Sequence, residues 1–157
     1  MTLAGAVPVQ VPLAAGDRHD LEAMADAITE RTRLVLVCTP NNPTGTTVTD
    51  AELELFLERV PRDVVVVIDE AYLEFVTAPD APDAVAVHRS RPNVVVLRTF
   101  SKAYGLAALR VGYGLMRPEL ADLFNRVRQP FNVNSLALVA AHAALGDQAY
   151  LEASRRE

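Results

Sequence analysis

Three short runs of apolar residues are the clearest pattern in the sequence. They cover residues 34–37, 64–68 and 94–97, and each is rich in valine and continuous rather than alternating. Strands that are covered on both faces typically show this pattern, whereas half-exposed strands alternate between apolar and polar positions. The runs therefore predict three buried strands.

A helix is predicted between the first and second runs. Thr49 and Glu52 have the spacing of a capping box, in which two side chains satisfy free backbone N–H groups of the first turn. Apolar residues then follow at helical spacing, namely Leu53, Phe56, Leu57 and Val60. A strand, a helix and a strand in this order favour parallel pairing of the two strands.

The segments on either side of these runs complete the predicted fold. A strand over Val7–Leu13 and a helix over residues 20–31, capped by Asp20, precede the first run. The third run is followed by a strand and two helices, over residues 110–115, 118–128 and 134–145. This alternation predicts an α/β fold with three layers, α/β/α, around a mostly parallel sheet.

Composition and charge limit the kinds of protein that the chain represents. Half of its 157 residues are hydrophobic, which suits one domain with a continuous core. The net charge is -5 without a basic block, so we expect no nucleic acid as a partner. No apolar run approaches the ~20 residues needed to span a bilayer, so no membrane is expected either. With one cysteine, Cys38, and no leader pattern, we expect a cytoplasmic protein.

Polar residues with reactive side chains follow each of the three runs. CTPNNPTG contains Asn42, DEAYLEF contains Asp69 and Tyr72, and RTFSKAYG contains Lys102. Ligands of doubly wound sheets bind beyond the carboxyl ends of the strands, so these side chains are expected at one edge. Taken singly, each has an ordinary interpretation, such as a turn, a helix cap, ring packing or a surface amine.

Together, these four side chains offer what pyridoxal phosphate requires. Lys102 supplies an amine that can bind the cofactor aldehyde covalently. Asp69 supplies the carboxylate that keeps the pyridine nitrogen protonated. Tyr72 and Asn42 can donate hydrogen bonds to the oxygen of the ring. The combination favours a cofactor site over four unrelated surface residues.

The stretch around Lys102 also offers groups that bind phosphate. Thr99 and Ser101 carry hydroxyls, and Arg110 carries a guanidinium that can pair with two phosphate oxygens. The sequence therefore predicts that one stretch provides both the covalent anchor and the phosphate site.

The motifs NNPTG, DEAY and FSKAYGLAALRVGY, in this order, resemble the large domain of fold-type I aminotransferases that use pyridoxal phosphate. They are most similar to histidinol-phosphate aminotransferases, as is the further stretch RVRQPFNVNSLA over residues 126–137. The resemblance covers essentially the whole chain. It implies that Lys102 binds the cofactor aldehyde, that Asp69 pairs with the pyridine nitrogen, and that Tyr72 and Asn42 contact the ring oxygen.

The same resemblance assigns the phosphate to Ser101 and Arg110, with Thr99 as a further contact. The chain departs from the family pattern at Ala108, where glycine is usual. Because alanine adds only one methyl group, we expect a small local adjustment near Arg110.

The resemblance further implies a reaction and an assembly. The reaction is amino transfer from histidinol phosphate to 2-oxoglutarate, in histidine biosynthesis, by a homodimer. Residues 1–157 are expected to form only part of the large domain, without the N-terminal segment and the C-terminal small domain of the family, and to have little activity alone. Two alternatives remain open: an amino-acid-phosphate decarboxylase of the same fold, and a sensor domain that binds the cofactor without turnover.

Other kinds of site find little support in the sequence. His19, His88 and His142 are far apart and lack companion ligands at short intervals, so no metal site is expected. Cys38 ends an apolar run and is expected to be a small buried residue rather than a nucleophile. The glycine-rich nucleotide-binding motifs G-x-x-x-x-G-K-[ST] and G-x-G-x-x-G are both missing from the sequence.

Overall fold

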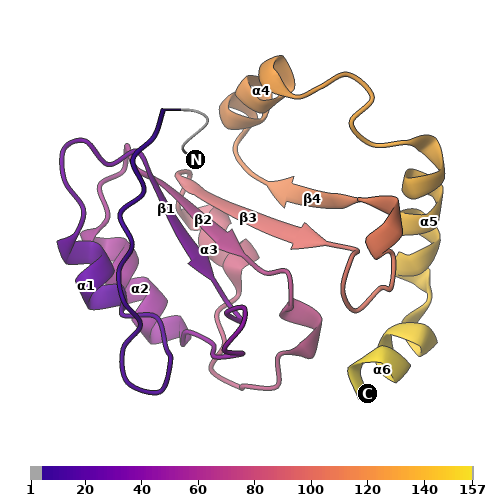
Figure 1. Cartoon of the computed structure of the whole chain (residues 1–157), viewed down its shortest axis with the longest axis horizontal. Helices are drawn as coiled ribbons and strands as arrows, with labels where there is room; N and C mark the ends of the chain where they lie inside the picture. Colours follow the sequence, from indigo (N-terminus) through magenta and orange to yellow (C-terminus); the bar gives the residue numbers. More distant parts are fainter. Residues whose placement is uncertain (1–4, 157) are drawn as a thin grey trace.

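A four-stranded sheet forms the centre of the protein (Figure 1). The computed structural model describes residues 5–156. The strands, in the order in which they lie side by side, are β1 (Leu34–Cys38), β2 (Val65–Asp69), β3 (Val94–Thr99) and β4 (Gly112–Leu115). β1, β2 and β3 are parallel, and β4 is antiparallel to β3, so β1 and β4 form the two edges. The predicted mostly parallel sheet is confirmed.

Helices precede, connect and follow the strands of the sheet. They are α1 (Leu21–Asp26), α2 (Asp50–Arg59), α3 (Ala84–Ser90), α4 (Pro118–Val127), α5 (Ser135–Gly146) and α6 (Gln148–Arg156), with short 3-10 turns η2 (Leu73–Phe75) and η3 (Ala107–Leu109). Figure 1 places α4, α5 and α6 beyond β4, on the side of the sheet away from α1 and α2. None of the described helices combines the length and the apolar composition that a membrane span requires.

The main hydrophobic core lies on one face of the sheet. Alternate residues of a strand share a face, and those of β2 and β3 on this face are fully buried, namely Val66, Ile68, Val94 and Val96. α1, α2 and α3 pack against them. On the opposite face of β1, Leu34 and Leu36 remain 47% and 43% exposed. The two faces of the sheet are therefore covered unequally by residues 5–156.

The predicted start of α2 is confirmed. The Thr49 hydroxyl accepts the Glu52 N–H at 3.2 Å, and the Glu52 carboxylate accepts the Thr49 N–H at 2.7 Å. The Thr49 N–H, aided by the guanidinium of Arg18, lowers the pKa of the Glu52 carboxyl. The capping box places Leu53 and Phe56 on the face that packs against the sheet.

The predicted strand over Val7–Leu13 is wrong. This segment pairs with no strand of the described residues, and Val7 and Val9 are 86% and 71% exposed. Pro8 and Pro12 lack the N–H group that a strand ladder needs. An alternating apolar pattern forms a strand only where a neighbouring strand can accept it.

The predicted helix over residues 20–31 is present but shorter, because α1 ends at Asp26. Asp20 caps its first turn as expected. Beyond the helix, the Thr32 hydroxyl accepts the Thr29 N–H at 2.9 Å and holds a turn instead. Threonine side chains compete in this way with the hydrogen bonds that would extend a helix.

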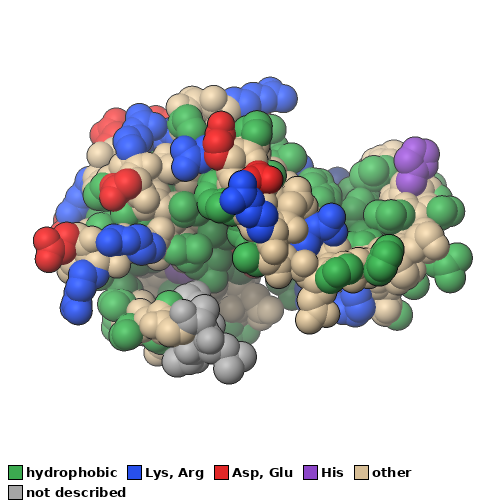
Figure 2. Space-filling view, turned by 90° about the horizontal axis from the view of Figure 1, so that it is seen from above, with side chains coloured by type: hydrophobic (Ala, Val, Ile, Leu, Met, Phe, Trp, Pro, Cys, Tyr) green, Lys and Arg blue, Asp and Glu red, His purple; other side chains and the backbone are tan. Residues whose placement is uncertain are grey.

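A second, smaller core joins α5 to the chain around β4. It contains Phe100, Val111, Ala137 and Ala141. Several large apolar side chains of α5 are open to solvent, with Leu136 76% exposed. Figure 2 shows hydrophobic side chains across this part of the surface, at the right of the view.

We expect Leu53→Ala to lower the free energy of unfolding by about 2–5 kcal/mol, because the side chain is fully buried and leaves a cavity. Leu55→Ala is the matched control, since Leu55 lies on the same helix but is 65% exposed. It should change the stability by no more than about 0.5 kcal/mol. Urea denaturation measures both values, and equal losses would contradict the placement of the core.

Candidate active site

The carboxyl ends of β1, β2 and β3 lie side by side and form one edge of the sheet. This edge runs across the ends of the strands and is distinct from the edge strands β1 and β4. Cys38 pairs with Asp69, and Asp69 pairs with Leu97. Two backbone hydrogen bonds continue this pairing: the Thr39 N–H donates to the Asp69 carbonyl at 3.0 Å, and the Glu70 N–H to the Leu97 carbonyl at 2.9 Å. The three loops that follow these strands therefore leave the sheet from a common edge.

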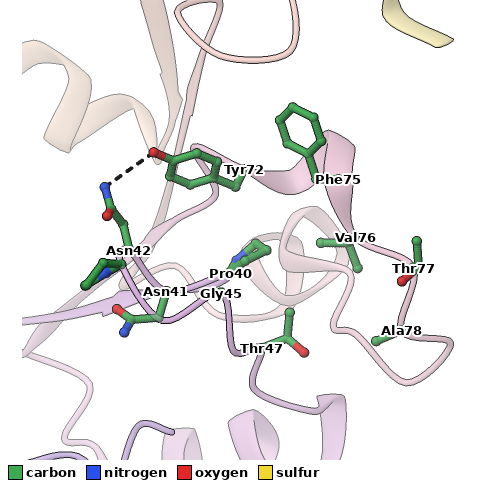
Figure 3. A pocket seen from close by; sticks show the side chains of 11 residues that line it. Pro40, Asn41, Asn42, Gly45, Thr47, Tyr72, Phe75, Val76, Thr77 and Ala78 are labelled. Carbon is green, nitrogen blue, oxygen red and sulfur yellow. Dashed lines mark hydrogen bonds between the residues drawn. The ribbon is translucent and has the colours of Figure 1, made fainter. Parts of the chain in front are cut away.

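Three of the predicted site residues meet beyond this edge. The Asn42 side-chain amide donates to the Tyr72 hydroxyl at 3.3 Å (Figure 3). The Lys102 ammonium lies 4.9 Å from the centre of the Tyr72 ring, within the range of a cation–π contact. An amide, a phenol and an amine from three separate loops are thus brought together, as the positions of their strands predict.

A cavity of about 410 Å³ opens beside Asn42 and Tyr72. Its walls come from two loops, residues 40–47 after β1 and residues 72–78 after β2, and Figure 3 shows their side chains around it. This volume lies within the usual range for small-molecule sites. Asn42 and Tyr72 line the cavity but Lys102 and Asp69 do not, so the cavity is lined by only part of the predicted cofactor site.

Asp69 ends β2 with a half-buried side chain. Its carboxylate accepts the Ala71 N–H at 3.1 Å, which fixes the turn that leads to Tyr72. A carboxylate has more acceptor positions than this one bond uses, so Asp69 can still bind a protonated nitrogen.

The loop that carries Lys102 is held at both ends. The Phe100 N–H donates to the Val111 carbonyl at 3.1 Å, and both side chains are buried in the smaller core. Within the loop, the Gly105 N–H donates to the Lys102 carbonyl at 2.8 Å. Gly105 has a φ of +68°, and a Cβ there would collide with the Tyr150 hydroxyl of α6. Lys102 is exposed, but its backbone is fixed.

The three predicted phosphate residues are only partly assembled. The Thr99 hydroxyl accepts the Ser101 N–H at 3.1 Å, so these two residues are adjacent. The guanidinium of Arg110 donates instead to the Ala107 carbonyl at 2.8 Å. Within residues 5–156, no hydrogen bond joins Arg110 to Thr99 or Ser101.

The departure at Ala108 requires little adjustment of the backbone. Ala108 is exposed within the right-handed turn η3, where alanine is accommodated without strain. The unusual conformation belongs to Arg110, which has a φ of +55°. A left-handed residue other than glycine costs about 1 kcal/mol and occurs often at functional sites.

Two charged residues at this edge were not predicted from the sequence. Glu70 is 2% exposed, and its carboxylate accepts the Arg98 Nε–H at 2.8 Å. Burial raises the pKa of the Glu70 carboxyl, and Arg98 opposes this shift. Burial acts to lower the pKa of Arg98, but Glu70 and Tyr113 together oppose it and the net pKa is raised. The signal in the sequence was two opposite charges at the ends of neighbouring apolar runs.

Two of the three histidines bond to backbone carbonyl groups. His19 bonds to the Cys38 carbonyl at 2.9 Å and His88 to the Val94 carbonyl at 2.7 Å. Among residues 5–156, no cluster of histidine, cysteine, aspartate or glutamate could hold a metal ion. Cys38 is half-buried, and burial raises the pKa of its thiol.

Comparison with known proteins decides the family of the chain. The family model of class I and II aminotransferases matches residues 1–157. This chain belongs to the class I and II aminotransferases.

Curated relatives of this aminotransferase chain carry two different names. Over 143 residues the chain is 62% identical to an aromatic amino acid aminotransferase of Streptomyces avermitilis. This match covers 91% of the chain and 40% of that protein. Over 136 residues the chain is 62% identical to histidinol-phosphate aminotransferase 1 of Cupriavidus pinatubonensis. This match covers 87% of the chain and 36% of that protein. The chain thus spans about two fifths of the length of these relatives.

A solved structure gives the same family and fold. Histidinol-phosphate aminotransferase from Sinorhizobium meliloti, in complex with pyridoxal-5'-phosphate, has a TM-score of 0.85 and 38% sequence identity. The match covers 94% of the aminotransferase chain and 40% of that protein. The predicted resemblance and the predicted α/β fold are confirmed.

We expect Cys38 to react more slowly with thiol reagents than an unhindered cysteine at the same pH. The reactive form is the thiolate, and burial raises the pKa of the thiol, so less thiolate is present at a given pH. The rate of reaction with a disulfide reagent, followed as the pH rises, measures this. Full reactivity near neutral pH would contradict the observed burial.

Proposed function

We propose that this chain forms the central part of the cofactor-binding domain of a pyridoxal-phosphate-dependent aminotransferase. The observation that carries the proposal is the contact of Lys102 with Tyr72, which bonds to Asn42 beyond the end of β2. Family membership and the cofactor in the Sinorhizobium meliloti structure support it. When bound, the cofactor supplies an electron sink for the substrate Cα.

The residues at the edge fit the polar groups of this cofactor. Lys102 offers the amine for the aldehyde and, once released, can move a proton at the substrate Cα through its Nζ. Asp69 can hold the proton of the pyridine nitrogen. Because Asn42 donates to the Tyr72 hydroxyl, the phenol proton of Tyr72 is free to be donated to the ring oxygen.

The phosphate is proposed to bind Thr99, Ser101 and Arg110. The Thr99 hydroxyl accepts the Ser101 N–H and can still donate its own proton. Arg110 donates one of its five N–H groups to the Ala107 carbonyl, so the other N–H groups can bind phosphate oxygens. The strained backbone at Arg110 fits a residue whose direction matters for binding.

For the substrates, we propose histidinol phosphate as the amino donor and 2-oxoglutarate as the acceptor, in histidine biosynthesis in the cytoplasm. The Cupriavidus pinatubonensis relative supports this choice. A second candidate is an aromatic amino acid as the donor, which the Streptomyces avermitilis relative favours at the same identity of 62%. Both kinds of donor carry a planar unsaturated ring close to the amine.

The remaining parts of the active site are proposed to lie outside these residues. The chain corresponds to about 40% of its relatives, so segments before and after it would supply other cofactor and substrate contacts. We propose that the whole enzyme is a homodimer and that residues 1–157 alone turn over slowly.

Treatment with pyridoxal phosphate and then borohydride should attach one pyridoxyl group to Lys102, the sole lysine of the chain. Lys102→Arg keeps the positive charge but forms no such bond, so its label should be lost. Peptide mapping by mass spectrometry measures the label, and the N-terminal amine serves as an internal control. Equal labelling of Lys102→Arg would show that the assignment is wrong.

A comparison of donors tests the proposed substrate. With 2-oxoglutarate as the acceptor, the protein that contains this chain should form glutamate faster from histidinol phosphate than from phenylalanine, and without release of carbon dioxide. Faster reaction of phenylalanine would favour the second candidate, whereas carbon dioxide would indicate a decarboxylase. Rapid turnover by residues 1–157 alone would contradict the proposal that other segments are required.

A further inference from the structure

The ion pair of Glu70 and Arg98 joins the strands that carry the proposed cofactor residues. Glu70 directly follows Asp69, and Arg98 directly precedes Thr99. The Arg98 Nε and the Glu70 Oε2 are 2.8 Å apart, and the two side chains are 21% and 2% exposed. A nearly buried bond between β2 and β3 therefore lies within one residue of two proposed cofactor contacts.

The pair and the cofactor residues point to opposite faces of the sheet. Val66 and Ile68 of β2 and Val94 and Val96 of β3 face the main core. Side chains alternate along a strand, so Glu70 and Arg98 continue this face at its edge. Asp69 and Thr99 then belong to the opposite face. Holding one set of side chains in place fixes the direction of the other set.

The backbone beside Arg98 is also confined from β4. Arg98 pairs with Tyr113, and Thr99 pairs with Gly112. A Cβ at Gly112 would lie 2.8 Å from the Arg98 carbonyl oxygen, closer than such contacts allow. Glycine thus permits a close approach on one side of Thr99, while Glu70 holds Arg98 from the other strand.

Stability alone gives a weak reason for this pair. Removing two charges from water costs about as much as their attraction returns, and apolar residues of similar volume are often as stable. The buried carboxylate shows that cost, because burial raises its pKa in spite of Arg98. The pair adds little stability but fixes the geometry of the strands. Its presence is better explained by the proposed role of the adjacent residues Asp69 and Thr99 in binding the cofactor.

We propose that Glu70 and Arg98 are positioning residues, which direct Asp69 and Thr99 toward the cofactor by locking the ends of β2 and β3 on the core side. This inference rests on the proposed function. It assigns the pair no contact with the cofactor itself.

The test compares variants of the full chain by three measurements: the melting temperature, the dissociation constant for pyridoxal phosphate, and the pH dependence of the visible absorbance of the bound cofactor. Glu70→Gln with Arg98→Met removes both charges at similar volume. This double variant should melt close to the parent, yet bind the cofactor about tenfold more weakly or worse, with a shifted pH profile.

The matched control is Asp26→Asn with Arg59→Met. Asp26 and Arg59 form an exposed ion pair between α1 and α2. Its loss should leave the dissociation constant and the pH profile at the parent values. A double variant of Glu70 and Arg98 that folds and matches the parent in both measurements would overturn the inference.

If that double variant fails to fold, Glu70→Asp tests the inference instead. This substitution keeps the charge but shortens the side chain by one methylene. Weaker cofactor binding with a retained fold supports positioning, and parent values overturn it.

The parent protein separates the two proposals. If the parent takes no borohydride label at Lys102, the proposed function fails and this inference fails with it. If the parent is labelled and the variants match it, only this inference fails.

Discussion

Parallel pairing of β1, β2 and β3 is the constraint on which the candidate site depends. It places Cys38, Asp69 and Leu97 in one row across the sheet. Backbone hydrogen bonds continue past this row, so the loops begin from fixed positions rather than from free strand ends. Parallel strands all end at the same edge, which is why residues distant in the sequence can act on one ligand.

The two cores support this edge in different ways. The larger core, with Ile68 and Val96, fixes the strands on the side of α1, α2 and α3. The smaller core, with Phe100 and Val111, fixes both ends of the loop that carries Lys102. The Lys102 side chain is therefore open to solvent while its backbone is held in place, which is the combination that the proposed covalent anchor needs.

The sequence predicted the parts of the structure that local rules determine. Continuous apolar runs gave the parallel strands, the Thr49 capping box gave α2, and the order of strand ends gave the meeting of Asn42, Tyr72 and Lys102. The parts that depend on distant partners were not predictable in this way. Val7–Leu13 has the pattern of a strand without a neighbour to pair with, and the Glu70–Arg98 bond exists only because of the strand register.

The open edge of β1 ties the solubility of the chain to pH. Among residues 5–156, β1 has a neighbour on one side only, and Leu34 and Leu36 on its exposed face add apolar surface to that edge. Unpaired edges of this kind invite strands of other molecules. The net charge of -5 keeps copies apart near neutral pH. With a pI of about 5.2, that repulsion fades in mildly acidic solution, where the chain is most prone to aggregate.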